Sequence, residues 1–253
     1  MRRANVVWMA AITYAIVAIG CGREAKQTAP VQTEAGGTLA AAPAARDAAQ
    51  RDTALVRVLH AIPGGEVSDV FAGDQVAFNQ LGYRSLTPYK ELAAERTTFR
   101  LRPANQDRAE PLAEESEGLG AGKHYTIVIL PGEKAKPATL KVLADDLVPP
   151  SEGKAKVRVV NASPDAGSVA VFVGGRTSPL VKGVSAASAS DYMETEPIQG
   201  TLEVRADRAV VASIPQTSIE PGGLYTVFLL GRTAERRGVE ALMTSDRVEP
   251  PAD

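Results

Sequence analysis

Side chains that could serve metal or acid–base chemistry are few in this sequence. Its 253 residues include two histidines, His60 and His124, and one cysteine, Cys21. A zinc site of the His/Cys type needs three or four such ligands, and a Ser-His-Asp triad would have to use one of the two histidines. The sequence also has no Gly-x-Ser-x-Gly nucleophile elbow. We therefore expect no catalytic residue, no metal site and no cofactor.

Two further segments have compositions that suggest binding loops. Residues 118–123 read Gly-Leu-Gly-Ala-Gly-Lys, but a phosphate-binding loop needs glycine where Glu117 stands, and Ser or Thr where His124 stands. An acidic run lacks the Asp-x-Asp spacing of known calcium loops. It comprises Glu110, Glu114, Glu115 and Glu117. We expect a turn at residues 118–123 and a solvated hairpin at the acidic run.

The charge balance argues against a nucleic-acid partner. Lys and Arg number 28 against 30 Asp and Glu, which leaves a formal net charge of −2. Such a balance creates no positive field that would attract the phosphate backbone of DNA or RNA.

The amino-terminal segment has the layout of a secretory signal peptide over residues 1–20. Arg2 and Arg3 supply positive charge, and an apolar run broken only by Thr13 follows over residues 6–19. This run is shorter than the roughly 20 residues that a membrane-spanning helix needs. A charged start, a short apolar stretch and small residues before the cleavage point are typical of secreted proteins.

Ala18-Ile19-Gly20-Cys21 resembles the bacterial lipobox, although Ala18 stands where Leu is usual. The resemblance implies that the Cys21 sulfur carries a diacylglyceryl group and that cleavage makes this residue the new amino terminus. Acyl chains together anchor a protein stably, because each buried CH₂ contributes about 0.8 kcal/mol. Gly22 follows where inner-membrane lipoproteins often have Asp, so the resemblance also implies the outer membrane of a Gram-negative cell envelope. An unmodified Cys21 after ordinary signal cleavage is the alternative.

Residues 21–53 are expected to form the lipidated cysteine and a flexible, disordered stalk. The segment from 22 onward is rich in Ala, Gly, Thr and Gln, with Val31 and Leu39 as its large aliphatic residues. A segment of this composition cannot bury enough apolar surface to offset its ordering entropy.

The rest of the chain repeats one unit of about 100 residues, over residues 54–150 and 154–251. Residues 56–63, Val-Arg-Val-Leu-His-Ala-Ile-Pro, match residues 157–164, Val-Arg-Val-Val-Asn-Ala-Ser-Pro. The match continues through later segments of the two units. These are 70–73 with 171–174, Gly82 with Gly183, Tyr89 with Tyr192, and Tyr125-Thr126 with Tyr225-Thr226. Pro149 to Gly153 form a short, stiff linker, which favours two independent modules.

Both units have the sequence pattern of all-β domains. Apolar and polar residues alternate over 202–206, as in a half-buried strand, whereas 224–230 is a nearly continuous apolar run that suits a central strand. Turn residues such as Pro164, Asp165 and Gly167 separate the strands. The fold class predicted is two tandem immunoglobulin-like β-sandwich domains.

The tyrosines sharpen this prediction. Residues 219–227, Ile-Glu-Pro-Gly-Gly-Leu-Tyr-Thr-Val, resemble the tyrosine corner of fibronectin type III domains, in which a tyrosine hydroxyl bonds to upstream backbone. We expect the Tyr225 hydroxyl to bond near Ile219 or Glu220, and Tyr125 to do the same in the first unit. The pair Tyr89 and Tyr192 is expected to be buried as well, which leaves Tyr83 without a counterpart.

The motif set as a whole resembles the family catalogued as domain of unknown function 4397. The residues that carry the resemblance are Val-Arg-Val-Val-Asn-Ala-Ser-Pro-Asp at 157–165, Phe172 within the strand 169–175, and Gly-Gly-Leu-Tyr-Thr-Val at 222–227. The first unit departs from the pattern at His60, which stands where Asn161 does, so a catalytic His60 would exist in one unit alone. The resemblance implies a secreted or lipid-anchored β-sandwich and no particular activity.

These observations lead to a lipid-anchored cell-envelope protein with a non-catalytic binding or structural role. The membrane is the expected partner through the anchor, and the loops could bind an envelope protein or a glycan. A carbohydrate-binding accessory module is the first alternative, although the one tryptophan, Trp8, lies in the signal segment and sugar platforms usually need exposed Trp or Tyr. A hydrolase using His60 or His124 is the second alternative.

Overall fold

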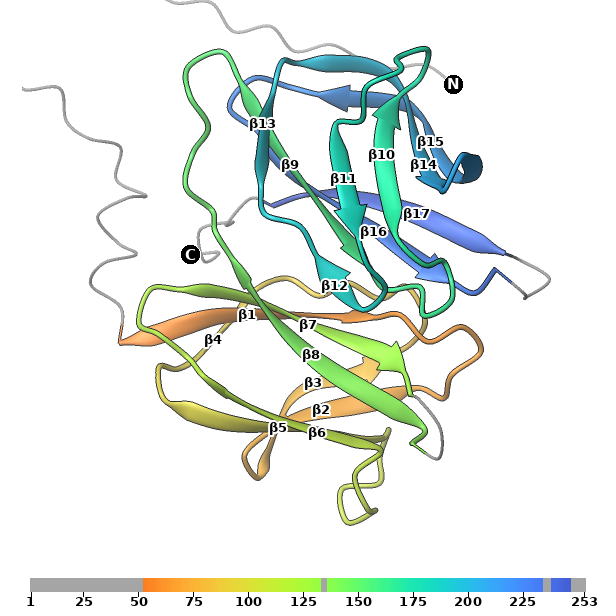
Figure 1. The fold of residues 1–253 in the computed structure, drawn as a ribbon. Helices are drawn as coiled ribbons and strands as arrows, with labels where there is room; N and C mark the ends of the chain where they lie inside the picture. Colours follow the sequence, from red (N-terminus) through yellow and green to blue (C-terminus); the bar gives the residue numbers. More distant parts are fainter. Residues whose placement is uncertain (1–51, 133–135, 234–237, 247–253) are drawn as a thin grey trace, which may run out of the picture. The chain divides into compact units, whose positions relative to one another are not determined.

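The computed structural model describes residues 52–132, 136–233 and 238–246, and these residues form strands and turns without a helix. The signal peptide, Cys21 and nearly all of the stalk lie outside the described residues. In the part of the chain that is described, no helix could span a membrane. The all-β fold class is confirmed, and each unit consists of two β-sheets (Figure 1).

The first repeat is a sandwich of two four-stranded sheets. One sheet has the order β4-β1-β7-β8 and consists of β4 (Lys90–Ala93), β1 (Thr53–His60), β7 (His124–Pro131) and β8 (Ala138–Asp145). The other has the order β3-β2-β5-β6 and consists of β3 (Gln75–Leu81), β2 (Ser68–Ala72), β5 (Arg96–Pro103) and β6 (Ala113–Gly118).

The second repeat has the same plan. Its first sheet has the order β12-β9-β16-β17, with β13 also paired to β9, and consists of β12 (Ser188–Ala189), β9 (Ala155–Asn161), β16 (Leu224–Gly231), β17 (Val239–Ser245) and β13 (Met193–Thr195). The other has the order β11-β10-β14-β15 and consists of β11 (Val181–Val184), β10 (Val169–Val173), β14 (Ile198–Ala206) and β15 (Ala209–Ile219). The predicted central strand at 224–230 is confirmed as β16.

A parallel strand pair lies at the centre of the first sheet of each repeat. β1 runs parallel to β7, and β9 runs parallel to β16, whereas the other strand pairs of the described residues are antiparallel. The register sets Arg57 beside Thr126 in the first repeat and Arg158 beside Thr226 in the second. Each arginine therefore has a threonine as its neighbour on the adjacent strand.

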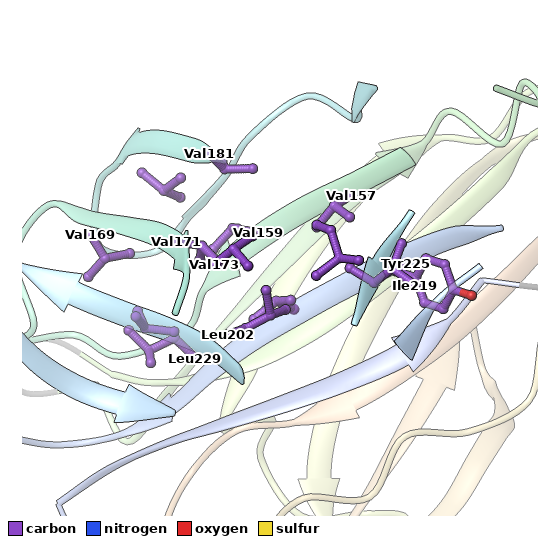
Figure 2. Packing of buried hydrophobic residues seen from close by; sticks show 14 of the residues in the cluster. Val157, Val159, Val169, Val171, Val173, Val181, Leu202, Ile219, Tyr225 and Leu229 are labelled. Carbon is purple, nitrogen blue, oxygen red and sulfur yellow. The ribbon is translucent and has the colours of Figure 1, made fainter. Parts of the chain in front are cut away.

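Each sandwich has its own apolar core between its two sheets. Figure 2 shows the core of the second repeat, where Val157 and Val159 of β9 lie near Leu202 of β14 and Leu229 of β16. Because β-strand side chains alternate between faces, the residues between these valines, Arg158 and Val160, point to the opposite face of the sheet. That second face is also buried, so β9 is covered on both sides.

A third apolar cluster joins the two repeats and covers those second faces. It combines side chains of β1 and β7 and the residue after β1 with those of β9 and β16 and the residue after β9. Its buried members are Leu59, Ala61, Val128, Leu130, Val160, Ala162, Phe228 and Leu230. The described residues of both repeats accordingly belong to one compact unit. The two predicted modules are therefore in contact through this cluster. The proline-rich linker gave no sign of the contact, because it depends on both faces of the central strands being apolar. Independent folding of each module stays a prediction.

Candidate functional site

Two arginines lie in the middle of the apolar central strands. Arg57 is 3% exposed and Arg158 is 2% exposed, and their positions match in the two repeats. A guanidinium group withdrawn from water costs several kcal/mol unless it is paired and hydrogen-bonded. Their surroundings must therefore supply negative charge and hydrogen-bond acceptors.

Each arginine first contacts groups of its own repeat. The Nε of Arg57 donates to Thr126 Oγ1 at 2.9 Å, and the guanidinium lies 4.7 Å from the centre of the Tyr89 ring. In the second repeat, Arg158 Nε donates to Thr226 Oγ1 at 2.8 Å. Its guanidinium likewise lies 4.7 Å from the centre of the Tyr192 ring. Both sites combine a hydrogen bond with a cation–π contact.

An aspartate at the end of the last strand of each repeat completes the set, since Asp145 ends β8 and Asp246 follows β17. Asp145 accepts hydrogen bonds from Thr126 Oγ1 and from the Tyr89 hydroxyl, both at 2.6 Å. Asp246 accepts them from Thr226 Oγ1 at 2.6 Å and from the Tyr192 hydroxyl at 2.9 Å. The side chains of both aspartates are 0% exposed. Each repeat thus holds one buried Arg, Thr, Tyr and Asp.

The two shortest buried ion pairs join the repeats, whereas Arg57 Nε lies 3.9 Å from Asp145 Oδ2 within the first repeat. Arg57 Nη2 of the first repeat donates to Asp246 Oδ1 of the second at 2.6 Å. Arg158 Nη2 of the second repeat donates to Asp145 Oδ1 of the first at 2.5 Å. We call these eight residues the reciprocal clasp. Its members are Arg57, Tyr89, Thr126, Asp145, Arg158, Tyr192, Thr226 and Asp246.

The interactions within the reciprocal clasp keep its two arginines charged and its two tyrosines neutral. Burial by itself lowers the pKa of Arg57, but the interactions with Tyr89 and with the carboxylates of Asp246 and Asp145 more than offset it, so the pKa is raised. Arg158 behaves in the same way, with Asp145 as the leading attraction. Burial is also the main reason that the pKa of Tyr89 and that of Tyr192 are raised, which keeps both phenols protonated as hydrogen-bond donors.

The chemistry of the reciprocal clasp is that of a structural contact. Two guanidinium and two carboxylate groups balance in charge and hydrogen-bond to one another, and solvent does not reach the side chains of the two aspartates. The apolar cluster of Leu59, Phe228 and their neighbours is buried between the same strands. The charged groups favour one placement of the two repeats relative to each other, because a buried charge that loses its partner is costly.

The tyrosine corners are confirmed in both repeats. The Glu220 amide donates to the Tyr225 hydroxyl at 3.0 Å, as expected from the sequence. The Gly120 amide donates to the Tyr125 hydroxyl at 2.9 Å. Both rings are buried in the core of their own repeat, and Figure 2 shows Tyr225 beside Ile219.

The two histidines lie at opposite ends of β1 and do not form a shared site. His124 pairs with Leu55 near the start of β1, whereas His60 ends the strand. His60 Nδ1 accepts a hydrogen bond from the Ile62 amide at 3.4 Å. Asn161 Oδ1 accepts the equivalent bond from the Ser163 amide at 3.2 Å, so His60 supports the same turn.

The segments that suggested binding loops have structural roles. Glu114 and its neighbours on β6 are exposed on an edge strand that pairs with β5 as a hairpin, and Glu114 forms a 2.7 Å ion pair with Arg100. Residues 118–123 form the turn before β7, closed by a bond from the Lys123 amide to the Gly120 carbonyl at 3.1 Å. Within the described ranges, no cluster of three His, Cys, Asp or Glu could hold a metal ion.

Comparison with protein families identifies the repeat. A family model described as "Domain of unknown function (DUF4397)" matches residues 54–172 and again residues 157–253. The chain belongs to the DUF4397 family. The two matches are consistent with tandem DUF4397 copies, and they overlap over 157–172, which holds the Val-Arg-Val-Val-Asn-Ala-Ser-Pro-Asp segment of the second copy.

Comparison with solved structures gives a likeness over part of the chain. The C-terminal domain of AlgF from P. aeruginosa aligns with 37% of this DUF4397 chain and 99% of its own, at 18% sequence identity and a TM-score of 0.32. No curated protein matches the chain.

Proposed function

We propose that this DUF4397 protein is a lipid-anchored component of the bacterial cell envelope whose two repeats act as one rigid head. The role of the head is binding or structural and not catalytic. The observation that carries this proposal is the exchange of Arg57–Asp246 and Arg158–Asp145 ion pairs between the repeats.

The free energy needed to separate the two repeats supports a rigid head. Separation of the repeats would expose the apolar side chains of Leu59, Phe228 and their neighbours. It would also break the ion pairs of Arg57 with Asp246 and of Arg158 with Asp145, and leave Arg57 only the longer 3.9 Å contact with Asp145. Removal of one partner from a buried ion pair typically costs about 3–5 kcal/mol. A head closed in this way presents its outer surfaces and loops in a fixed arrangement.

A non-catalytic role is supported by the placement of the titratable side chains. The carboxylates of the reciprocal clasp are enclosed, and His60 supports a turn that Asn161 supports in the other repeat. The hydroxyls of Tyr89, Tyr192 and Tyr225 bond inside the protein, so these rings do not provide the exposed platform that aromatic sugar binding uses.

The anchor is supported by the sequence. The signal-like segment 1–20 leads directly to Cys21, the single thiol of the chain. In a Gram-negative host we expect labelled palmitate to enter the wild-type protein and not Cys21→Ser. Equal labelling of the two proteins would contradict the proposal.

The destination within the envelope can be tested with a second variant. Gly22→Asp changes the residue after the lipidated cysteine and keeps the lipobox. We expect this variant to be labelled like the wild type but to fractionate with the inner membrane, whereas the wild type fractionates with the outer membrane. Identical fractionation of the two proteins would contradict the outer-membrane assignment.

A further inference from the structure

A polar pocket lies on the first repeat, away from the reciprocal clasp. It has a volume of about 640 Å³ and is lined by Asp69, Val76, Asn79, Gln80, Asn105 and Asp107. The lining comes from β2, β3 and the loop of residues 104–112 between β5 and β6. The pocket is open to solvent, and its lining is mostly polar.

Asp69 holds the walls of this pocket in place. The residue is 4% exposed. Its Oδ1 accepts a hydrogen bond from the Gln80 amide at 2.7 Å, and its Oδ2 accepts one from the Asn105 amide at 3.0 Å. One buried carboxylate therefore fixes both β3 and the 104–112 loop.

Both residues held by Asp69 have a backbone conformation that favours glycine. Gln80 has φ of 54° and Asn105 has φ of 63°, values that are uncommon for residues with a Cβ atom. The second repeat has glycine at the position of Gln80. Strand pairing places Gln80 between Phe78 and Leu81, and Gly183, with φ of 74°, takes the same place between Val181 and Val184.

This pairing corrects the sequence match of Gly82 with Gly183. It also shows that the first repeat keeps a strained glutamine where glycine would be relaxed. Such strain is commonly retained where a side chain serves binding or catalysis.

Two other differences between the repeats fall at the same pocket. Asp69 pairs with Arg102, and its counterpart Ala170 pairs with Arg205. Residues 104–112 join β5 to β6, whereas Asp207 and Arg208 alone join β14 to β15.

The framework around these differences is shared by the two repeats. Arg102 lies 4.9 Å from the centre of the Phe71 ring, and Arg205 lies 4.2 Å from that of Phe172. The two repeats thus share one framework. The first repeat differs from the second at Asp69, at Gln80 and in the 104–112 loop, and all three line the pocket.

We infer that this pocket binds a neutral, hydroxyl-rich ligand of the saccharide class. Carboxylates accept hydrogen bonds from hydroxyl groups, and the amides of Asn79, Gln80 and Asn105 can both donate and accept. Val76, which is 40% exposed, offers an apolar surface to the C–H face of a sugar ring. The lining contains no Lys or Arg, so the pocket disfavours anionic ligands.

The volume of the pocket also exceeds what a bare cation would fill. The inference rests on the proposed binding role of the head and names its ligand class.

The test uses the purified full chain on an array of neutral and anionic glycans, followed by calorimetric titration with the neutral glycan that binds best. Asn79→Ala removes an exposed pocket amide. Lys182→Ala changes the exposed residue at the same strand position of the second repeat and is the matched control. We expect Asn79→Ala to bind roughly tenfold more weakly, as loss of about 1.4 kcal/mol implies, and Lys182→Ala to bind like the wild type.

A second variant separates binding from stability. Gln80→Gly should raise the denaturation midpoint, because glycine relieves the positive φ, and should weaken glycan binding. A purely structural Gln80 would not produce this opposite pair of effects.

Three results would overturn the inference. They are the absence of neutral-glycan binding by the wild type, binding unchanged in both Asn79→Ala and Gln80→Gly, and titratable binding of Ca²⁺ alone with no glycan binding. None of these results bears on palmitate labelling at Cys21. A failure of the inferred glycan binding can therefore be distinguished from a failure of the proposed lipid anchor.

Discussion

Arg57 and Asp246 are 189 positions apart in the sequence, yet Arg57 Nη2 donates to Asp246 Oδ1 at 2.6 Å in a buried contact. Arg158 and Asp145 form the same contact with the repeats interchanged. Each repeat supplies one cation and one anion, and the shortest ion pair of each arginine is with the aspartate of the other repeat, whereas Arg57 lies 3.9 Å from Asp145 of its own repeat. We therefore expect the two copies of the DUF4397 domain to stabilise each other.

Separately expressed repeats should show this dependence. A fragment of residues 52–150 would expose Leu59 and Val128 and leave Arg57 without Asp246, and the fragment 154–246 would carry the complementary defect. We expect each fragment to be markedly less stable than the intact chain and the two to associate one to one when mixed. Size-exclusion chromatography and calorimetry would measure this. Fragments that stay monomeric in the mixture, each as stable as the intact chain, would contradict the expectation.

The tyrosine corner offers a test within one repeat. Tyr225→Phe keeps the ring and loses the bond from the Glu220 amide, which should lower the free energy of unfolding by about 1 kcal/mol, or up to about 3 if the amide is left unsatisfied. Tyr225→Ala adds a cavity and should cost about 3–5 kcal/mol by analogy with Phe→Ala. Tyr125→Phe should match Tyr225→Phe, because the corner is the same. Denaturant melts of the intact chain would measure all three, and a Tyr225→Ala protein as stable as the wild type would show the corner to be unimportant.

His60 should make stability depend on pH. Burial lowers the pKa of His60 from its ordinary value of 6.5, so the unfolded chain binds a proton more readily than the folded one. Stability therefore rises with pH through the window just below 6.5 and falls on acidification, by at most about 1.4 kcal/mol per pH unit. His60→Asn installs the residue found at the matching position of the second repeat. We expect a shallower fall in the unfolding free energy of this variant between pH 6.5 and 5, and an unchanged slope would count against a buried neutral His60.

The fold was predictable because its signals are local. Alternating apolar residues at 202–206, the continuous run at 224–230 and the turn around Pro221 each reflect interactions between near neighbours in the sequence. The tyrosine corner was predictable for the same reason, since Tyr225 bonds a backbone group five positions upstream.

The pairing of the repeats was not predictable from those signals. Arg57 and Arg158 match in the two repeats, but a charged residue in a strand is equally consistent with an exposed face. The missing information was that both faces of β1 and β9 are covered. A signal was nevertheless present, because Arg, Tyr and Thr recur together in both units, and Asp145 and Asp246 share the spacing that Arg57 and Arg158 have.

The polar pocket was not predicted from the sequence, because it is built from residues in which the two repeats differ. Repeat matching highlights what two copies share, whereas Asp69, Gln80 and the 104–112 loop are differences. These differences become visible only with the strand register, which shows that Gln80, and not Gly82, is the residue equivalent to Gly183.

The reciprocal clasp can be probed against an ion pair that also joins the repeats but lies at the surface. Arg84 Nη1 contacts Glu240 Oε2 at 2.9 Å, and these side chains are 51% and 26% exposed. Exposed pairs contribute about 0–1 kcal/mol. The double replacement of Arg84 and Glu240 by alanine should therefore show little coupling, and it serves as the matched control for the buried pair.

A double-mutant cycle on Arg57→Met and Asp246→Asn tests the mutual dependence of the repeats most directly. Each single variant should lose about 3–5 kcal/mol of unfolding free energy, because a buried charge is left without its partner. The double variant should lose less than the sum of the singles, with a coupling of about 2 kcal/mol or more between residues of different repeats. Additive losses within about 0.5 kcal/mol, no greater than those of Arg84 and Glu240, would show that the two repeats do not stabilise each other through the reciprocal clasp.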